Sequence, residues 1–198
     1  MARPQSPDYD KRRDAIVAAA SRLYARQGFQ GASVSDLAKA CGASKSLVYH
    51  YFPSKEDILH EVMASHLELL VDAAEDVLRL SALGPRDRLH ALALAFMKLY
   101  ADAADSHKVL LNELDNLPPE RRGDVVAKQR RIIAIVEEQI REIRPDTGPL
   151  TFPLTMLFFG MINWTHTWFR ADGAVTPERL ADMAVDLMLD GLAGVQAS

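Results

Sequence analysis

Cysteine is nearly missing from this 198-residue sequence, which holds a single thiol at Cys41. A lone cysteine forms no intramolecular disulfide and builds no thiolate zinc cluster, so disulfide-stapled secreted scaffolds and zinc fingers are excluded. This cysteine usage favours a reducing, cytoplasmic location.

Sequence motifs of common enzyme classes are also missing, since there is no glycine-rich phosphate loop, no nucleophile elbow and no HExxH. Two Asp-x-x-His pairs, Asp57 with His60 and Asp87 with His90, have the spacing used in di-metal helical bundles. Such bundles usually use Glu and need two further carboxylates, and acidic residues are common at helix beginnings anyway. We expect no catalytic residue, no metal and no cofactor. A metal-dependent helical enzyme is the alternative.

A long hydrophobic run occurs once, at 150–169, where no Asp, Glu, Lys or Arg interrupts 20 residues. That length could span a bilayer as a helix. Pro153, Asn163 and His166 argue against a span, because polar groups in lipid need partners that a lone helix lacks. No apolar stretch resembling a signal peptide occurs near the start of the sequence. We expect a helix buried in protein and no membrane partner.

Charge is unevenly distributed along the chain. Residues 1–60 hold nine Lys or Arg against six Asp or Glu, whereas residues 61–198 hold 14 against 21. A mildly basic head on an acidic body is compatible with a head that binds a polyanion such as nucleic acid.

Apolar residues recur at three- and four-residue spacing along almost the whole chain, and no window alternates with period two. The sequence therefore predicts an all-α fold of about nine helices. The expected ranges are 10–27, 33–40, 44–52, 55–80, 85–104, 108–117, 119–144, 149–170 and 176–192.

Two short helices near the amino terminus form a helix-turn-helix. Ser33 and Asp36 have the spacing of a capping box, Ser44 can cap the next helix, and Gly42 lies in the turn between them. With the preceding helix they predict a three-helix DNA-binding domain at 8–53, followed by a second helical domain at 54–198.

The second helix of such a motif presents its first turns to the major groove. We expect phosphate contacts at the helix starts capped by Ser33 and Ser44, and from Lys45, Tyr49 and Lys55. Base edges would be read by Lys45, Ser46 and His50. For the neighbouring aromatics, Tyr51 and Phe52, packing is the expected role.

The run GFQGASVSDLAKACGASKSLVYHYFPSKEDIL resembles the DNA-binding signature of TetR-type transcriptional regulators. It departs from the common pattern at Ala43 and Ser46, and Ser46 makes transferred base preferences doubtful. The resemblance implies that residues 54–198 form a ligand-binding and dimerisation domain. It implies a homodimer that contacts its partner through the last two helices, a ligand pocket in the body, and repression relieved by a small molecule. A two-fold dimer would bind a palindromic double-stranded operator, because it repeats each contact one helical turn away.

The last two apolar segments are the candidates for the dimer interface, since they are more apolar than a monomer's outer helices need to be. The interface residues we expect are Met156, Trp168, Met183, Leu187 and Met188.

The effector pocket is expected where polar side chains interrupt apolar helices. These residues are His66, Tyr100, Asn112, Asn163 and Trp164, with Phe96 and Phe159, for which core packing is the simpler role. Residues 158–192 are similar to the carboxy-terminal end of TetR-type regulators of fatty-acid, steroid and aromatic-acid breakdown. Several of those respond to acyl-CoA thioesters, so a CoA thioester is one candidate effector. Its phosphates would need cations such as the basic residues of 121–131, for which a solvated helix face is the alternative.

These observations together predict a ligand-responsive transcriptional regulator, most simply a repressor. Besides the metal-dependent enzyme, the alternative is a helical scaffold that shares the head without binding DNA. Such a scaffold would show no sequence-selective duplex binding.

Overall fold

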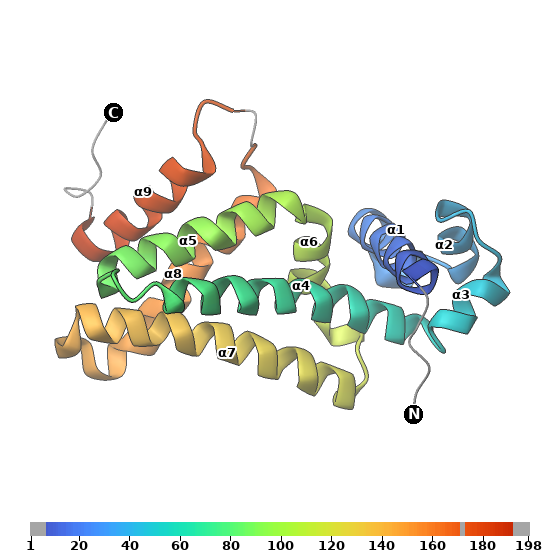
Figure 1. Ribbon diagram of the computed structural model, residues 1–198, viewed down its shortest axis with the longest axis horizontal. Helices are drawn as coiled ribbons and strands as arrows, with labels where there is room; N and C mark the ends of the chain where they lie inside the picture. Colours follow the sequence, from blue (N-terminus) through green and yellow to red (C-terminus); the bar gives the residue numbers. More distant parts are fainter. Residues whose placement is uncertain (1–6, 171–172, 192–198) are drawn as a thin grey trace. The chain divides into compact units, whose positions relative to one another are not determined.

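The computed structural model describes residues 7–170 and 173–191, and within these ranges the chain is helical without strands (Figure 1). The prediction of an all-α fold is confirmed. The α-helices of the described ranges are α1 (Pro7–Gly31), α2 (Val34–Ala40), α3 (Lys45–Tyr51), α4 (Lys55–Arg79), α5 (Pro85–Asp102), α6 (Ala104–Asn112), α7 (Pro119–Ile143), α8 (Thr151–Asn163) and α9 (Pro177–Asp190).

The chain folds into two compact units. The first consists of the described residues up to His66 together with Asp105–Val126, and the second of Leu67–Ala104 with the described residues from Ala127 onward. Helices α4 and α7 therefore contribute residues to both units. The domain boundary expected after residue 53 falls inside the first unit and remains a prediction.

Helix α1 is interrupted at the glycine that was expected to end it. Gly28 has a φ of 72°, a backbone conformation that costs glycine little, and a further turn follows to Gly31. The deviation brings Phe29 back onto the helix bundle, where its ring lies 5.4 Å from that of Tyr24. Gly28 is thus a kink within α1.

Two expected helices were wrong in extent. The helix expected at 108–117 begins earlier, as α6, and a separate 3₁₀ turn follows at Leu114–Asn116. The helix expected at 149–170 is divided into a 3₁₀ segment at Pro145–Leu150, then α8, then a 3₁₀ turn at Trp164–Thr167.

Side-chain hydroxyl groups explain where α8 ends. Thr165 Oγ1 donates to the carbonyl of Ile162 at 2.5 Å, and Thr167 Oγ1 donates to that of Trp164 at 2.8 Å. These local bonds compete with helix continuation. Among the helices of the described ranges, none combines the length and apolarity that a bilayer span requires.

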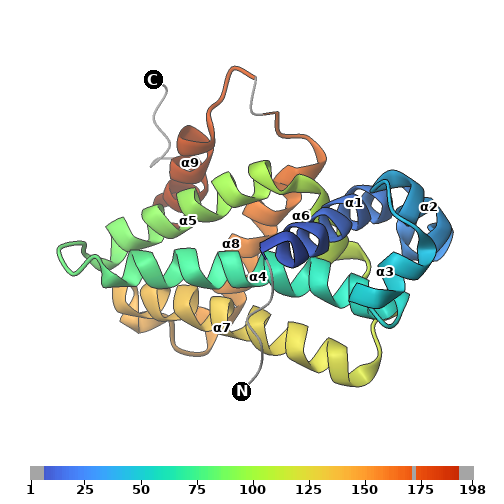
Figure 2. The same ribbon diagram turned by 45° about the vertical axis from the view of Figure 1, so that its right-hand side comes forward.

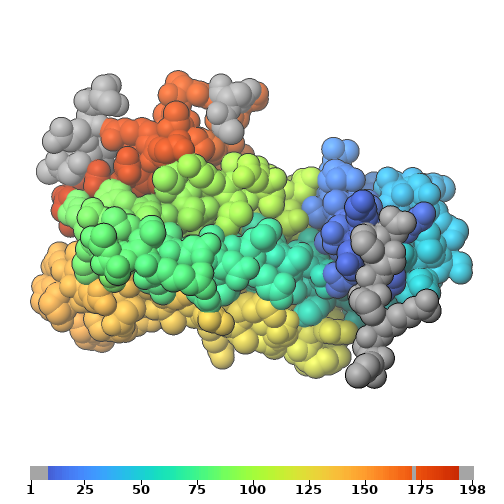
Figure 3. Space-filling model, viewed as in Figure 1, coloured from blue at the N-terminus to red at the C-terminus, as the bar shows by residue number. Residues whose placement is uncertain are grey.

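The second unit is a layered helical bundle. The turns of α4 from Leu67 onward lie between α5 and α7, as Figures 1, 2 and 3 show. Its interior is apolar, with Leu92, Phe96 and Phe158 fully buried. Helix α9 packs along α5.

Ion pairs lie along the outer edge of the α5 and α9 pair. Arg86 pairs with Asp186 at 3.2 Å, and Lys98 pairs with Glu178 at 3.1 Å. Each exposed pair contributes only about 0.2–1 kcal/mol, so burial of apolar side chains is the main force that holds α9 on α5.

Candidate nucleic-acid interface

Serine side chains begin the two helices of the helix-turn-helix, as the sequence predicted. The Asp36 amide donates to Ser33 Oγ at 3.1 Å, the Ser33 amide donates to the Asp36 carboxylate at 3.3 Å, and the Leu47 amide donates to Ser44 Oγ at 3.1 Å. Hydrogen bonds from Ser33 hold the pKa of Asp36 below its usual value. The Ser33 hydroxyl also donates to the Asp36 carboxylate, at 2.5 Å. Both hydrogen-bond donors of Ser33, its amide and its hydroxyl, are therefore directed at Asp36. The phosphate contact assigned to Ser33 remains a prediction, and it would require these bonds to rearrange.

The turn between the helices depends on a left-handed glycine. Gly42 has a φ of 64°, and the amide of Ala43 then donates back to the carbonyl of Ala38 at 2.8 Å. This closure directs the chain from α2 into α3.

Helix α3 separates a buried side from an exposed one. Val48 is fully buried and Leu47 is half-buried, whereas Tyr49 is 43% exposed. The four side chains expected to meet the DNA groove are all exposed at helical spacing: Lys45, Ser46, Tyr49 and His50. Their contacts with DNA remain predictions, and the geometry required for them is present.

Lys55 lies in a different setting from those four residues. Its ammonium group donates to the carbonyl of Phe29 and lies 4.0 Å from the centre of the Phe29 ring. These contacts tie the start of α4 to the end of α1. The phosphate contact predicted for Lys55 would compete with them.

The segment 105–126 packs on the head within the first unit. Gln30 donates to Asn116 at 2.7 Å, Arg121 pairs with Asp57 at 2.5 Å, and His60 pairs with Asp124 at 2.8 Å. Sequence reasoning missed these contacts, because residues about 64 to 86 positions apart give no local signal. Residues 105–126 thus contact the end of α1 and the start of α4 within the first unit.

The Asp-x-x-His pairs do not form metal sites. Asp57 accepts hydrogen bonds from Ser54 and Arg121, which lower its pKa, while His60 faces Asp124. His90 faces Asp182 and Asp186 across the α5 and α9 pair. In the ranges that the structure describes, no group of three metal-ligating side chains occurs.

The basic residues of α7 pair with acids on neighbouring segments. Arg122 lies 2.8 Å from Asp115, Lys128 lies 3.8 Å from Glu68, and Arg131 pairs with Glu75. Any phosphate that approached this helix would compete with those carboxylates.

Two residues expected in the effector pocket are exposed in this structure, and their assignment to the pocket remains a prediction. Asn112 is exposed and donates to the carbonyl of Lys108 on its own helix at 2.8 Å. Trp164 is 65% exposed, because the helix ends there and a 3₁₀ turn directs the ring outward.

The other pocket candidates are buried, but in different units. In the second unit Phe96 lies 6.2 Å from Phe159 and 6.4 Å from Tyr100, measured between ring centres, and burial raises the pKa of the Tyr100 hydroxyl. Asn163 is half-buried, and its Oδ1 is enclosed without a hydrogen-bond partner.

In the first unit, His66 and His107 are buried with their ring nitrogens 3.2 Å apart, and burial lowers the pKa of His66 to about 4. The pocket candidates thus belong to different units, and their roles in effector binding remain predictions.

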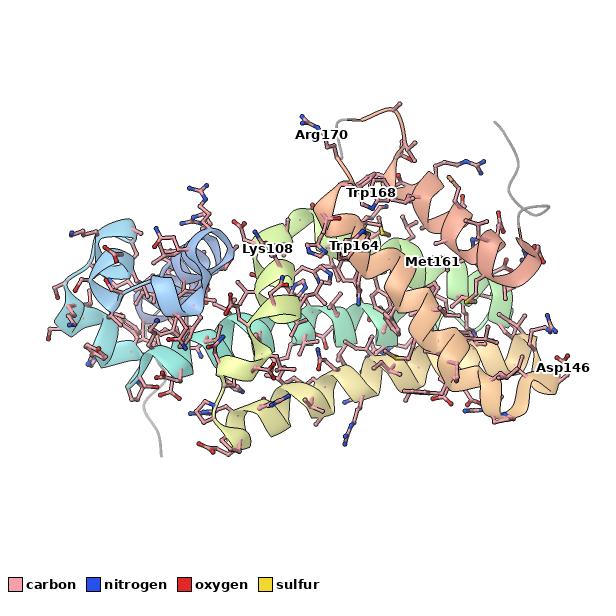
Figure 4. The ribbon with its side chains drawn as sticks, turned by 180° about the vertical axis from the view of Figure 1, so that it is seen from behind. Lys108, Asp146, Met161, Trp164, Trp168 and Arg170 are labelled. Carbon is pink, nitrogen blue, oxygen red and sulfur yellow. The ribbon has the colours of Figure 1, made fainter. Side chains whose placement is uncertain are left out.

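An apolar groove runs between α8 and α9 within the second unit. It encloses about 550 Å³, and Figure 4 shows Met161, Trp164 and Trp168 along the end of α8 and the turn that follows. Met183 and Leu187 line it from α9. Of the expected interface residues, Trp168, Met183 and Leu187 thus share the groove, and Met156 is 43% exposed on α8. Met188 lines a separate hollow of about 220 Å³ beside Ile140.

Comparison with known families covers most of the chain. Residues 16–62 match the family described as "Bacterial regulatory proteins, tetR family", and residues 82–192 match "Tetracyclin repressor-like, C-terminal domain".

Individual relatives match over nearly their whole length. A TetR-family transcriptional regulator from Bordetella parapertussis 12822 is 42% identical, with a TM-score of 0.89 over 94% of this chain and 98% of that one. AibR, solved in complex with isovaleryl coenzyme A and operator DNA, is 26% identical, with a TM-score of 0.78 over 90% and 98%. The HTH-type transcriptional repressor KstR2 of Mycobacterium tuberculosis is 24% identical over 92% of this chain and 94% of its own.

Proposed function

Because the chain belongs to the TetR family of bacterial transcriptional regulators, we propose that it binds a palindromic operator as a homodimer and leaves it when a small effector fills the helical body. Regulation by DNA binding follows from the family. The dimer, the palindrome and the effector are the proposal.

The exposed side of α3 supports the DNA contact and is the observation that carries the proposal. Lys45 and Tyr49 are directed to solvent beside Ser46 and His50, and the Lys45 ammonium lies 5.9 Å from the Tyr49 ring. Lysine and tyrosine suit phosphate oxygens, while serine and histidine can bond to base edges.

The apolar groove between α8 and α9 supports the homodimer. Leu157 is 64% exposed, Trp164 65% and Trp168 56%, which is unusual for large apolar side chains that are close together on one surface. A second copy of the same surface, related by a two-fold axis, would remove these side chains from water. The two heads would then address half-sites about 34 Å apart, one helical turn of DNA.

A small apolar effector, with a CoA thioester as the candidate, is supported by the relatives and by the apolar body. AibR was solved with isovaleryl coenzyme A. In this chain Phe96, Tyr100 and Phe159 form an aromatic cluster in the interior. An acyl group suits such surroundings.

Helices α4 and α7 belong to both units, and we expect them to couple effector binding to release of the operator. An effector in the second unit would displace α4 beyond Leu67 or α7 beyond Val126, and the first unit includes the beginnings of both helices. The coupling expected between such sites is about 1–3 kcal/mol, or 5- to 150-fold in operator affinity.

The proposal includes no catalytic step and no resident metal, and it places the protein in the cytoplasm, where a bacterial operator lies. Selection of bound duplexes from a random library by the full-length protein tests it. We expect enrichment of a palindrome with half-sites one turn apart, followed by loss of binding when the effector is added. Enrichment of single, unrepeated sites would contradict the dimer, and no enrichment would support the helical scaffold that does not bind DNA.

Candidate effectors can be identified from the protein itself. Denaturing the purified protein and taking a mass spectrum of the supernatant should show a bound thioester, which can then be added to the operator complex. If ligands that bind the body leave operator affinity unchanged, the release mechanism is wrong.

A further inference from the structure

Three aromatic rings meet at the end of the helix expected to read the DNA. The ring of Tyr9, in the first turn of α1, lies 4.5 Å from that of Tyr51 and 6.4 Å from that of His50, measured between centres. His50 and Tyr51 are themselves 5.4 Å apart and nearly perpendicular, at 84°. All three residues belong to the first unit.

The contact is separate from the core of the head. Ile16 is the first fully buried residue among the described side chains of α1, two turns after Tyr9. Tyr9 itself is half-buried, and the ring that it approaches edge-on belongs to an exposed histidine. Tyr9 thus lies at the margin of the three-helix core, where its ring contacts both Tyr51 and His50 of α3.

An exposed histidine near a helix end has several accessible side-chain rotamers, and each presents its ring nitrogens in a different direction. Tyr9 approaches His50 at an interplanar angle of 78°, and Tyr51 approaches it at 84°. Edge-to-face contacts of this kind favour one ring orientation. They limit the directions in which the imidazole can meet a base edge.

We propose that Tyr9 is a positioning residue for sequence readout, whose ring, together with Tyr51, holds the His50 imidazole in the orientation that contacts a base. This inference rests on the proposed function, in which His50 reads a base edge. It extends the DNA-reading surface to the first turn of α1, outside the helix-turn-helix.

The test compares base preferences, because a purely structural role would not change them at one position. Wild type, His50→Ala, Tyr9→Leu and Tyr9→Phe are each used to select duplexes from a random library. We expect His50→Ala to lose preference at one position of each half-site. Tyr9→Leu should weaken preference at that same position by about fivefold, the order of one aromatic contact, and Tyr9→Phe should restore it.

Matched controls separate this role from general weakening. Gln27→Ala changes an exposed neutral residue elsewhere on α1 and should leave the preferences as in wild type. A uniform loss of affinity in Tyr9→Leu, a change at a different position, or no change would overturn the inference. If wild type enriches a palindrome and His50→Ala enriches the same palindrome with the same base preferences, only this inference fails. If wild type enriches nothing, the proposed function fails with it.

Discussion

The Arg121 guanidinium lies 2.5 Å from the carboxylate of Asp57, although the two residues are separated by 64 positions. Asp57 also accepts a hydrogen bond from its helix-capping neighbour, Ser54, at 2.7 Å. This carboxylate therefore connects the start of α4 with the start of α7. Both helices continue into the second unit.

Arg121→Gln should cost about 0.5–1 kcal/mol of unfolding free energy at neutral pH, a small value because the Arg121 side chain is 47% exposed. Ser54 and Arg121 lower the folded-state pKa of Asp57 below its unfolded value of 3.8. The stabilisation is therefore present above that value and is lost as the pH falls through the folded pKa. Denaturant titrations of both proteins at pH 7 and at a series of acid pH values below 3.8 should show the difference shrink as Asp57 becomes protonated. A constant difference would show that the pair does not act through charge.

His66→Gln tests a buried imidazole. Burial lowers the pKa of His66 from 6.5 to about 4, so the unfolded chain takes up its proton first as the pH falls. Wild type should therefore lose stability between pH 6.5 and 4, by up to about 3 kcal/mol, from this group. The unfolding free energy of the variant should lack this dependence on pH. Urea unfolding at half-unit intervals measures it, and parallel curves for the two proteins would refute it.

Trp164→Glu should dissociate the proposed dimer, because it places a charge in the apolar groove between α8 and α9. We expect the dimer dissociation constant to rise at least about 100-fold, equivalent to about 3 kcal/mol, with helical circular dichroism unchanged. Leu69→Glu is the matched control, since Leu69 is 52% exposed on α4. Analytical ultracentrifugation provides the measurement. If the two substitutions raise the dissociation constant equally, the groove is not part of the dimer interface.

Tyr49→Ala and Lys55→Ala should both weaken operator binding without changing base preference, because phosphate contacts carry no sequence information. Their effects on stability should differ. Tyr49 is exposed, whereas Lys55 contacts the carbonyl and ring of Phe29, so only its loss should cost stability, about 1–2 kcal/mol. Thermal unfolding and fluorescence anisotropy with a selected duplex measure both quantities. A change confined to one operator base would contradict the phosphate assignment.

The sequence predicted what depends on local interactions. The capping roles of Ser33 and Ser44 follow from residue type and spacing, and each side chain accepts the expected amide hydrogen bond. The exposed face of α3 follows from helical periodicity. What it could not predict depends on distant parts of the chain, such as the contact between Gln30 and Asn116 or between Tyr9 and Tyr51.

Helix ends were the other weakness of the sequence-based prediction. Apolar periodicity continues through Trp164 and Trp168, but threonine hydroxyl groups bond to local carbonyls and end α8 before them. Trp164 is therefore 65% exposed and lines the groove between α8 and α9.

Cys41 ends α2 at the turn of the DNA-reading motif, where it is half-buried. Since it is the sole thiol of the sequence, a sulfhydryl-directed spin label attaches at one point per chain. In a two-fold dimer, the distance between the two labels would report the distance between the two DNA-binding heads. Pulsed electron paramagnetic resonance would measure this distance with and without the effector.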